Sequence, residues 1–278
     1  MVLPLEGSFS NQRPLVLVGA GKMGGALALG WLQQGLSPDA LRVIDPAPPA
    51  SSLAFLQRYE IGVDAAAPEG VTARGLVIAV KPQAMSAVLP GLRVLLAPDT
   101  LVLSIAAGIR LATLGEGLGG GRIVRSMPNT PAEIGRGMTV AIAAPDVDDQ
   151  SARLAGRLLE AVGKVSWVDD ESLIDAATAV SGSGPAYVFL LAEALAAAAV
   201  SAGLPADLAD ILARQTVSGA GELLFRSDLS AETLRKNVTS PNGTTAAALA
   251  VLMAANGLPA LMEAAVAAAK RRAEELSA

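Results

Sequence analysis

Two residue types that often carry chemistry are missing from this chain, because its 278 residues include no cysteine and no histidine. Without cysteine there is no disulfide framework and no thiol nucleophile. Without histidine, the usual zinc sites and imidazole acid–base catalysis are excluded as well. Any chemistry must therefore come from other side chains, from the backbone or from a bound cofactor, and we expect no metal site.

Aromatic residues are scarce, and negative charge exceeds positive charge. The chain is 52% hydrophobic but only 3% aromatic, with a formal net charge of −5 and a pI near 4.9. Nucleic-acid binding depends on clustered lysine and arginine, and binding of single strands depends on aromatic stacking. We therefore expect a small-molecule ligand and no nucleic-acid partner.

Targeting and membrane-spanning signals are also lacking. The segment Met1–Arg13 has neither a basic start nor a continuous apolar core, so it does not resemble a signal peptide. The longest uncharged run, Asn237–Met262, is interrupted near both ends by proline, glycine and asparagine. We predict a buried loop and helix there rather than a membrane span, and a cytoplasmic protein.

A glycine-rich turn near the N-terminus is the feature around which the chain is organised. The apolar run Leu15–Val18 leads into Gly19-x-Gly21-x-x-Gly24 and then into the helical pattern Ala26–Leu32. This spacing allows a tight turn, close approach of the backbone to a pyrophosphate, and packing of a helix on a strand. Asp45 lies 21 residues beyond Gly24, where an acid commonly binds the adenosine ribose. The alternative is a glycine turn without a ligand.

Short apolar runs alternate with helix-length segments as far as Val168, which indicates a parallel sheet with crossover helices in an α/β domain over residues 1–168. Because ligands lie at the carboxyl ends of parallel strands, the loops that start at Lys81, Ala106 and Ser126 should share one edge with Gly21 and form a crevice. For each loop by itself, the alternative is an ordinary strand-to-helix turn. The predicted strands are Leu15–Val18, Leu41–Ile44, Leu76–Val80, Thr100–Ile105, Arg122–Arg125, Met138–Ala143 and Lys164–Val168, with a weaker one at Gly62–Ala65.

After Val168 the strand signals stop, and residues 169–278 indicate an all-helical second domain. Alanine-rich helices are predicted at Ala186–Ala202 and Pro259–Leu276. About 110 residues rarely bury so many aliphatic side chains in one bundle, so we expect this domain to form a subunit interface.

Two polar segments interrupt the helical domain. Ser181-Gly-Ser-Gly-Pro185 breaks the helical pattern and is predicted to form a pocket wall. The segment Asn237–Thr245 precedes the apolar helix Ala246–Ala254, so it gathers N–H groups and hydroxyls at a helix N-terminus, as anion sites do. The alternative for this loop is a plain helix cap made by Asn242 or Thr244.

Five segments, in this order and spacing, resemble the pyrroline-5-carboxylate reductase family over nearly the whole chain. They are Gly19-Ala-Gly-Lys-Met-Gly24, Val80-Lys-Pro-Gln83, Met127-Pro-Asn-Thr-Pro131, Ser181-Gly-Ser-Gly-Pro-Ala-Tyr187 and Val238-Thr-Ser-Pro-Asn-Gly-Thr-Thr245. The resemblance implies a Rossmann domain followed by an all-α dimerisation domain, and a homodimer that often builds a larger ring. It also implies an oxidoreductase that reduces a cyclic imine to L-proline with NADPH or NADH, the last step of proline biosynthesis.

Matched position by position, the resemblance implies the site residues. Thr245 would be the catalytic group, with a hydrogen bond to the ring nitrogen. Glu171 would contact the substrate, and the alternative for this residue is that its charge only favours the start of a helix. The substrate contacts would be Glu171, Val238, Ser240, Gly243, Thr244 and Thr245. The cofactor contacts would be Val18, Gly19, Ala20, Gly21, Lys22, Met23, Gly24, Asp45, Ala79, Val80, Lys81, Pro82, Ala106, Ala107, Pro185 and Asn237.

Three positions depart from the family pattern. Asn242 stands where many members have glycine, and Ala65-Ala66-Ala67 stands where many have a cofactor-facing asparagine. The carboxylate of Asp45 would repel a ribose phosphate, which puts the family's usual preference for NADPH in doubt. Arg42 is close enough in sequence to bind that phosphate instead.

The implied reaction suits a chain without histidine or cysteine, because a protonated imine is already electrophilic and needs a positioned hydride more than a strong acid. A related two-domain hydroxyacid dehydrogenase would need a lysine four residues before an asparagine in the helical domain. Here Lys236 and Lys270 precede Ser240 and Glu274 at that spacing. A non-catalytic dinucleotide sensor is the third hypothesis, and it would need no carboxylate-binding loop.

Overall fold

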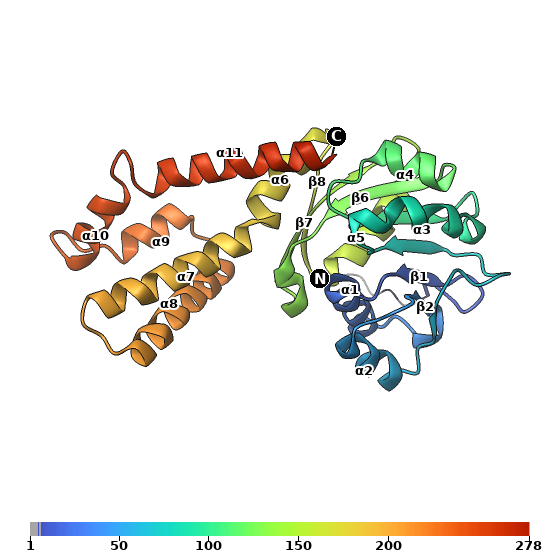
Figure 1. Ribbon diagram of the computed structural model, residues 1–278, viewed down its shortest axis with the longest axis horizontal. Helices are drawn as coiled ribbons and strands as arrows, with labels where there is room; N and C mark the ends of the chain where they lie inside the picture. Colours follow the sequence, from blue (N-terminus) through green and yellow to red (C-terminus); the bar gives the residue numbers. More distant parts are fainter. Residues whose placement is uncertain (1–4, 6, 278) are drawn as a thin grey trace. The chain divides into compact units, whose positions relative to one another are not determined.

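The computed structural model describes residue 5 and residues 7–277, and it consists of two compact units (Figure 1). One unit contains the chain up to Gly182 together with the segment from Lys270 onward, and the other is Ser183–Ala269. The boundary between the two compact units therefore lies after Gly182, whereas the sequence predicts a domain boundary after Val168. The reason is that helix α6 (Ser172–Ala177) packs against the sheet of the first unit, where Ile174 is buried beside two strands.

An eight-stranded sheet forms the centre of the first unit, with the strand order β3-β2-β1-β4-β5-β6-β7-β8. Each of the eight predicted runs is a strand, with small differences at the ends. The strands are β1 Leu15–Val18, β2 Leu41–Ile44, β3 Val63–Asp64, β4 Gly75–Ile78, β5 Leu101–Ser104, β6 Arg122–Met127, β7 Gly137–Ala143 and β8 Gly163–Trp167.

The prediction of a parallel sheet is correct as far as β6 and wrong for the last two strands. Strand β7 is antiparallel to β6, and β8 is parallel to β7. Residues 128–136 join β6 to β7 and contain only the short 3₁₀ helix Thr130–Ile134. A parallel crossover needs a dozen or so residues, so this connection returns as an antiparallel neighbour. The carboxyl ends of β1, β4, β5 and β6 still share one edge, as predicted.

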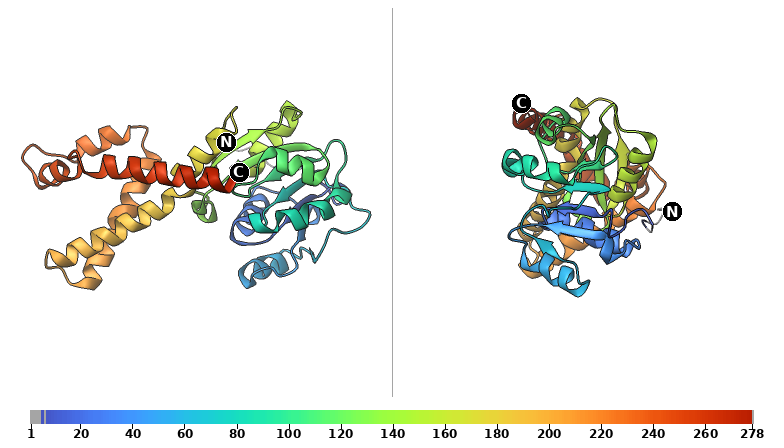
Figure 2. Two further views of the ribbon diagram at one scale, coloured as in Figure 1. Left: turned by 45° about the horizontal axis from the view of Figure 1, so that its top comes forward. Right: turned by 90° about the vertical axis from the view of Figure 1, so that its right-hand side faces the viewer.

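Helices cover both faces of the sheet (Figure 2). Alternate strand residues face opposite sides, so Leu17 packs in the cluster with α1 and α5, whereas Val16 packs in the cluster with α3 and α4. Trp31 of α1 is fully buried, and its Nε1 donates to the Leu158 carbonyl oxygen of α5 at 2.8 Å. The helices on the sheet are α1 Lys22–Gln33, α2 Ala50–Arg58, α3 Met85–Leu92, α4 Leu111–Leu118 and α5 Asp149–Glu160.

The second unit is helical, as predicted, and α7 and α8 pack side by side in it (Figure 1). The predicted break at Ser181–Pro185 is present: a π-helical turn, Thr178–Gly182, ends the segment that begins with α6, and Pro185 lies in the first turn of the next helix. The helices are α7 Gly184–Ser201, α8 Ala206–Arg226, α9 Ala231–Asn237, α10 Thr244–Leu252 and α11 Leu258–Ser277, the last of which ends in the first unit.

Apolar side chains of the second unit are mostly exposed. Between Ser183 and Ala269, where every residue is described, only Ala209 and Ala213 are buried. Phe189 and Ile211 are 67% and 62% exposed. The prediction of a buried loop and helix within Asn237–Met262 is therefore wrong for the single chain, although the segment does form a loop and a helix. One described helical segment, Ser172–Ser201, is long and apolar enough to cross a membrane by length and composition alone.

Candidate functional site

A cavity of 820 Å³ lies at the carboxyl edge of the sheet, beside the glycine turn. Because β1 separates β2 from β4 and the chain order reverses there, this is the place where doubly wound sheets bind ligands. Seven of the predicted cofactor residues line the cavity, namely Val18, Gly19, Gly21, Asp45, Ala79, Val80 and Lys81. The cavity therefore lies beside the glycine turn at which the sequence predicts a dinucleotide.

The three glycines of the motif differ in what an added Cβ would meet. Gly19 has a positive φ of 94°, and a Cβ there would lie 2.9 Å from the Ala79 carbonyl carbon and oxygen. A Cβ on Gly24 would lie 2.1 Å from the Gly19 carbonyl oxygen. A Cβ on Gly21 would meet no described atom within 4 Å, because this residue borders the cavity. No side chain among the described residues caps α1, so its first N–H groups suit a phosphate.

Asp45 has a structural role that the sequence does not reveal. Its Oδ2 accepts a hydrogen bond from the Ala20 amide at 2.7 Å, and its Oδ1 accepts one from the Ala47 amide at 2.9 Å. The carboxylate therefore holds the glycine turn while it also lines the cavity. A substitution at Asp45 changes the turn as well as the charge that faces the ligand.

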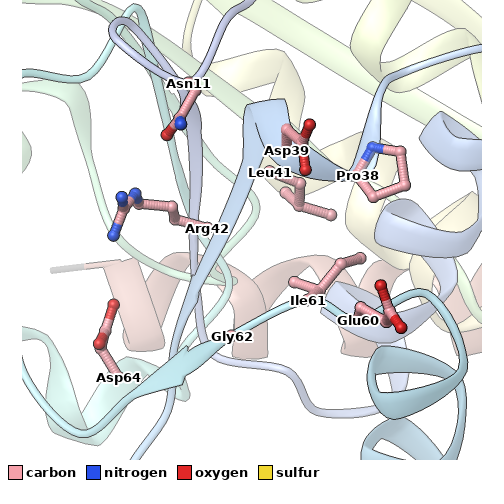
Figure 3. Close-up of a pocket in the computed structure, with 9 residues that line it drawn as sticks. All are labelled: Asn11, Pro38, Asp39, Leu41, Arg42, Glu60, Ile61, Gly62 and Asp64. Carbon is pink, nitrogen blue, oxygen red and sulfur yellow. The ribbon is translucent and has the colours of Figure 1, made fainter.

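Arg42 does not line this cavity. It shares a separate hollow of 290 Å³ with three acidic residues, Asp39, Glu60 and Asp64 (Figure 3). The charged residues that line the larger cavity are Asp45, Glu69 and Lys81. The structure thus gives no support to Arg42 as a phosphate ligand, and the cavity lining carries more negative than positive charge.

Several cavity residues were missed from the sequence. Small side chains of the α3 region form one helical stripe on the cavity wall. Their spacing of three or four residues in the sequence could have indicated that alanine, valine and glycine share this face of the helix. The missed residues are Ile44, Pro46, Ala47, Pro49, Glu69, Ala84, Ala87, Val88, Gly91, Leu92 and Val94. Ala65, Ala66 and Ala67 also line the cavity, so the alanines that replace the family's asparagine do face the proposed cofactor site.

The other predicted cofactor residues do not line this cavity. Ala20, Lys22, Met23 and Gly24 belong to the turn and to the start of α1, and Pro82 follows β4. Ala106 and Ala107 follow β5 at the same edge of the sheet. Pro185 and Asn237 belong to the second unit.

The predicted substrate loop ends at the N-terminus of α10. Gly243 directly precedes the helix, and within this fully described loop no side chain hydrogen-bonds to the helix start. The alternative of a cap by Asn242 or Thr244 is therefore not observed. The N–H groups of Thr244, Thr245 and Ala246 begin the helix, where intrahelical acceptors are absent, so they form a donor set suited to a carboxylate.

Asn242 adopts the left-handed conformation, with φ 58°. Only glycine enters this region freely, and asparagine is the residue that follows it most readily. Asparagine therefore suits the backbone conformation that this loop has at residue 242. This explains how Asn242 is accepted at that position.

Glu171 is held within the first unit. Its Oε1 accepts from Arg125 Nη1 at 2.7 Å and from the Leu111 amide, at the start of α4, at 2.8 Å. At the start of α6, the Oδ1 of Asp170, and not the carboxylate of Glu171, accepts a hydrogen bond from the Ser172 amide at 2.9 Å. Hydrogen bonds from the Ser172 hydroxyl and amide lower the pKa of Asp170. Glu171 thus supports a neighbouring helix, an arrangement that neither sequence hypothesis contained.

Comparison with known proteins identifies the family. Residues 171–276 match the model described as pyrroline-5-carboxylate reductase dimerisation, and residues 14–108 match the model described as NADP oxidoreductase, coenzyme F420-dependent. A pyrroline-5-carboxylate reductase of Pseudomonas aeruginosa is 43% identical over 266 residues, covering 95% of this chain and 96% of that protein. The chain belongs to the pyrroline-5-carboxylate reductase family.

Solved structures of pyrroline-5-carboxylate reductases have the same fold. One from Coxiella burnetii has a TM-score of 0.88 and 36% identity, covering 96% of this chain and 99% of that chain. One from Plasmodium falciparum, with NADP bound, has a TM-score of 0.78 and 28% identity, covering 97% of this chain and all of that chain. The predicted family and fold class are confirmed, and the chain is an NAD(P)H-dependent oxidoreductase.

Proposed function

We propose that this chain reduces 1-pyrroline-5-carboxylate to L-proline with hydride from NADPH or NADH, the last step of proline biosynthesis. The observation that supports this most is the pair of sites in one chain: a dinucleotide cavity at the glycine turn and a donor-rich helix start after a polar loop. A sensor needs only the first of these sites. The relative from Pseudomonas aeruginosa, which matches over nearly its full length, bears the name of this enzyme.

The chain's residues would mainly orient a reactive substrate. A protonated cyclic imine accepts hydride readily, and the bound cofactor supplies that hydride. The amides of Thr244 and Thr245 would hold the substrate carboxylate, since both these N–H groups and the helix dipole favour an anion there. The Gly243 amide instead donates to the Ser240 carbonyl oxygen at 3.1 Å. The Thr245 hydroxyl would hydrogen-bond to the ring nitrogen, and water would complete proton delivery.

The remaining site residues are proposed from the family pattern. Val238, which is 64% exposed, and Ser240 would border the substrate. Ala106, Ala107, Pro185 and Asn237 would complete the cofactor site. For Glu171 the observed bonds support an indirect role, because its Oε1 already accepts two donors from the first unit.

An absorbance assay of reduced nicotinamide tests the proposal directly. We expect oxidation of NADH or NADPH with pyrroline-5-carboxylate and no activity with short hydroxyacids. Turnover of a hydroxyacid would favour the dehydrogenase hypothesis instead. Cofactor binding without turnover of either substrate would favour the sensor.

We also propose that NADH serves at least as well as NADPH. Asp45 lines the cavity, and its charge would oppose a 2′-phosphate by about 1 kcal/mol if it lies about 4 Å away in a water-like medium. Asp45→Asn should therefore raise the ratio of kcat/KM for NADPH to that for NADH about fivefold. The ratio is the useful quantity, because loss of an acceptor for the Ala20 or Ala47 amide should weaken both cofactors alike.

Glu69→Gln is the matched control for this prediction. Glu69 lines the same cavity, and its removal eliminates one negative charge while the acceptor of the Ala20 amide is retained. We expect a smaller change in the cofactor ratio than with Asp45→Asn. An unchanged ratio in Asp45→Asn, with NADPH preferred throughout, would remove Asp45 from the account of cofactor choice.

The match to a dimerisation model supports a homodimer, and we propose that residues 169–278 supply both its interface and the substrate site. The exposed apolar side chains of the second unit, such as Phe189, Ile211 and Leu261, support this because water contact with so large an apolar surface is unfavourable. We further propose a cytoplasmic protein with no nucleic-acid or membrane partner, whose dimers can join in a larger ring. Helix α7, which makes up most of the apolar segment Ser172–Ser201, would then lie in a subunit interface.

Two fragments test whether the first unit alone binds the cofactor and whether the helical region is needed for imine reduction. A fragment that ends at Gly182 keeps α6 and the Arg125–Glu171 ion pair, whereas one that ends at Val168 loses both. We expect the longer fragment to bind cofactor, as measured by nicotinamide fluorescence, and to show no imine reduction. We expect the shorter fragment to be less stable and equally inactive. Imine reduction by either fragment would contradict the assignment of the substrate site to the helical region.

A further inference from the structure

Four buried or half-buried polar side chains join segments of the first unit that are far apart in sequence. Arg125 of β6 is 2% exposed, and its Nη1 lies 2.7 Å from Oε1 of Glu171. Its Nη2 lies 3.6 Å from Oδ1 of Asp175, which is also buried. The Oγ of Ser277, at the end of α11, lies 2.9 Å from the same Oδ1. We call these four residues the latch.

The latch fixes the last turn of the described chain. A buried carboxylate is costly unless charges and hydrogen bonds compensate it, and Asp175 receives both a guanidinium and a hydroxyl. Leu276 is 60% exposed, so apolar burial of this side chain contributes little to holding the turn. The bond from Ser277 to Asp175 therefore attaches the turn to α6, beside the buried side chain of Ala273.

The latch segments touch the loop between β5 and α4 at two places. Glu171 Oε1 accepts from the Leu111 amide, where the loop ends and α4 begins. In the middle of the loop, Gly108 has φ +73°, and a Cβ there would lie 2.9 Å from the Leu276 carbonyl oxygen. The last turn of α11 thus lies directly against the loop that the latch also holds at its far end.

This loop carries Ala106 and Ala107, next to the strand end that lines the dinucleotide cavity. Strand β5 pairs with β4, and Ala79 to Lys81 follow β4 into the cavity wall. We infer that Asp175 and Ser277 are positioning residues for the cofactor, because they hold the C-terminal turn against loop 106–108 and so set the shape of that loop. The inference rests on the proposed contact of Ala106 and Ala107 with the cofactor.

Ser277→Ala tests the latch in the full-length protein. The dissociation constants of NADH and NADPH are measured by nicotinamide fluorescence, beside KM for the cofactor, kcat and the melting temperature. We expect the dissociation constant and the cofactor KM to rise about three- to tenfold, the range of one hydrogen bond, with kcat at saturating cofactor nearly unchanged. Ser277→Thr keeps the hydroxyl and should bind cofactor like the wild type.

Two further variants make the result specific. Ser201→Ala is the matched control. Both serine hydroxyls lie close to the carbonyl oxygen four residues earlier, Ser277 at 2.9 Å from that of Ala273 and Ser201 at 3.1 Å from that of Ala197, but Ser201 is exposed in α7. This control variant should leave cofactor binding unchanged. Gly108→Ala pushes against the Leu276 carbonyl and should weaken cofactor binding, and adding Ser277→Ala to it should have little further effect.

The outcomes separate this inference from the proposed function. A lower melting temperature in Ser277→Ala with an unchanged cofactor dissociation constant would overturn the inference, because the hydroxyl would then serve the fold alone. Additive effects of Gly108→Ala and Ser277→Ala would overturn it too. Failure of the proposed function would instead appear in the wild type, as cofactor binding without imine reduction. If Ser277→Ala does not fold, Asp175→Asn carries the test, because it weakens the acceptor of the Ser277 hydroxyl, and an unchanged cofactor dissociation constant in that variant would overturn the inference.

Discussion

Replacement of Thr245 by valine should slow imine reduction about ten- to a hundredfold, while the cofactor dissociation constant stays unchanged. Valine keeps the shape of threonine and removes only the hydroxyl. Thr245 is the second residue of α10, directly after the donor-rich loop, and it is half-buried. If its hydroxyl bonds to the ring nitrogen as hydride arrives, the loss is about 1.5–3 kcal/mol of transition-state stabilisation. Steady-state kcat and kcat/KM for the imine measure it.

Thr244→Val is the control one residue away. Thr244 is the first residue of α10 and is exposed, and the described loop residues place Gly243 rather than Thr244 at the cap position. We therefore expect this variant to change neither the rate nor the melting temperature appreciably. If Thr244→Val is slow and Thr245→Val is not, the catalytic hydroxyl has been assigned to the wrong residue. If neither is slow, the loop acts through its backbone alone.

Replacement of Gly21 by alanine should weaken the binding of both cofactors at least about tenfold without loss of stability. An added Cβ on Gly21 would meet no described atom within 4 Å, so the folded protein accepts it. Gly21 borders the cavity, however, and a methyl group there occupies the space in which a pyrophosphate approaches the backbone. Fluorescence titration with NADH and NADPH, beside thermal unfolding, gives both quantities.

Gly24→Ala is the contrasting variant within the same motif. Its Cβ would lie 2.1 Å from the Gly19 carbonyl oxygen, which is too close for any contact, so strand and helix must move apart. Overpacking of this kind costs about 1–3 kcal/mol, and we expect a melting temperature lower by several degrees. A stable Gly21→Ala protein with wild-type affinity would contradict the placement of the pyrophosphate. Equal melting temperatures for the two variants would contradict the steric roles assigned to the glycines.

Local signals predicted the elements of this fold well. Each apolar run of the first half is a strand because β-branched and aliphatic residues suit buried parallel strands, and the alanine-rich segments are helices because alanine favours helix. The reversal of β7 was missed, since strand direction depends on the length of the connection rather than on the strand residues. The predicted division after Val168 was based on the last strand signal, whereas the contacts of Ile174 join α6 to the sheet.

Pairings between distant residues were not predictable from spacing. Nothing near Ser277 in the sequence indicates a bond to Asp175, which is 102 residues away. The same is true of the Leu111 amide and the Glu171 carboxylate, 60 residues apart. A side chain satisfies its hydrogen-bonding capacity with whatever the fold brings near, and only the packed arrangement of β6, α4, α6 and the end of α11 decides which group that is.

The sequence by itself determined two local backbone features. The glycine spacing predicts the turn after β1, and the loop Asn237–Thr245 predicts a donor-rich helix start, because both depend on backbone geometry within a few neighbouring residues. Only the tertiary structure decided which partners the individual charged side chains have. Asp45 holds the Ala20 amide, Glu171 supports α4, and Arg42 lies outside the cavity. The physical reason is range: backbone turns are set by local sterics, whereas a carboxylate or guanidinium interacts with partners that only the folded chain brings together.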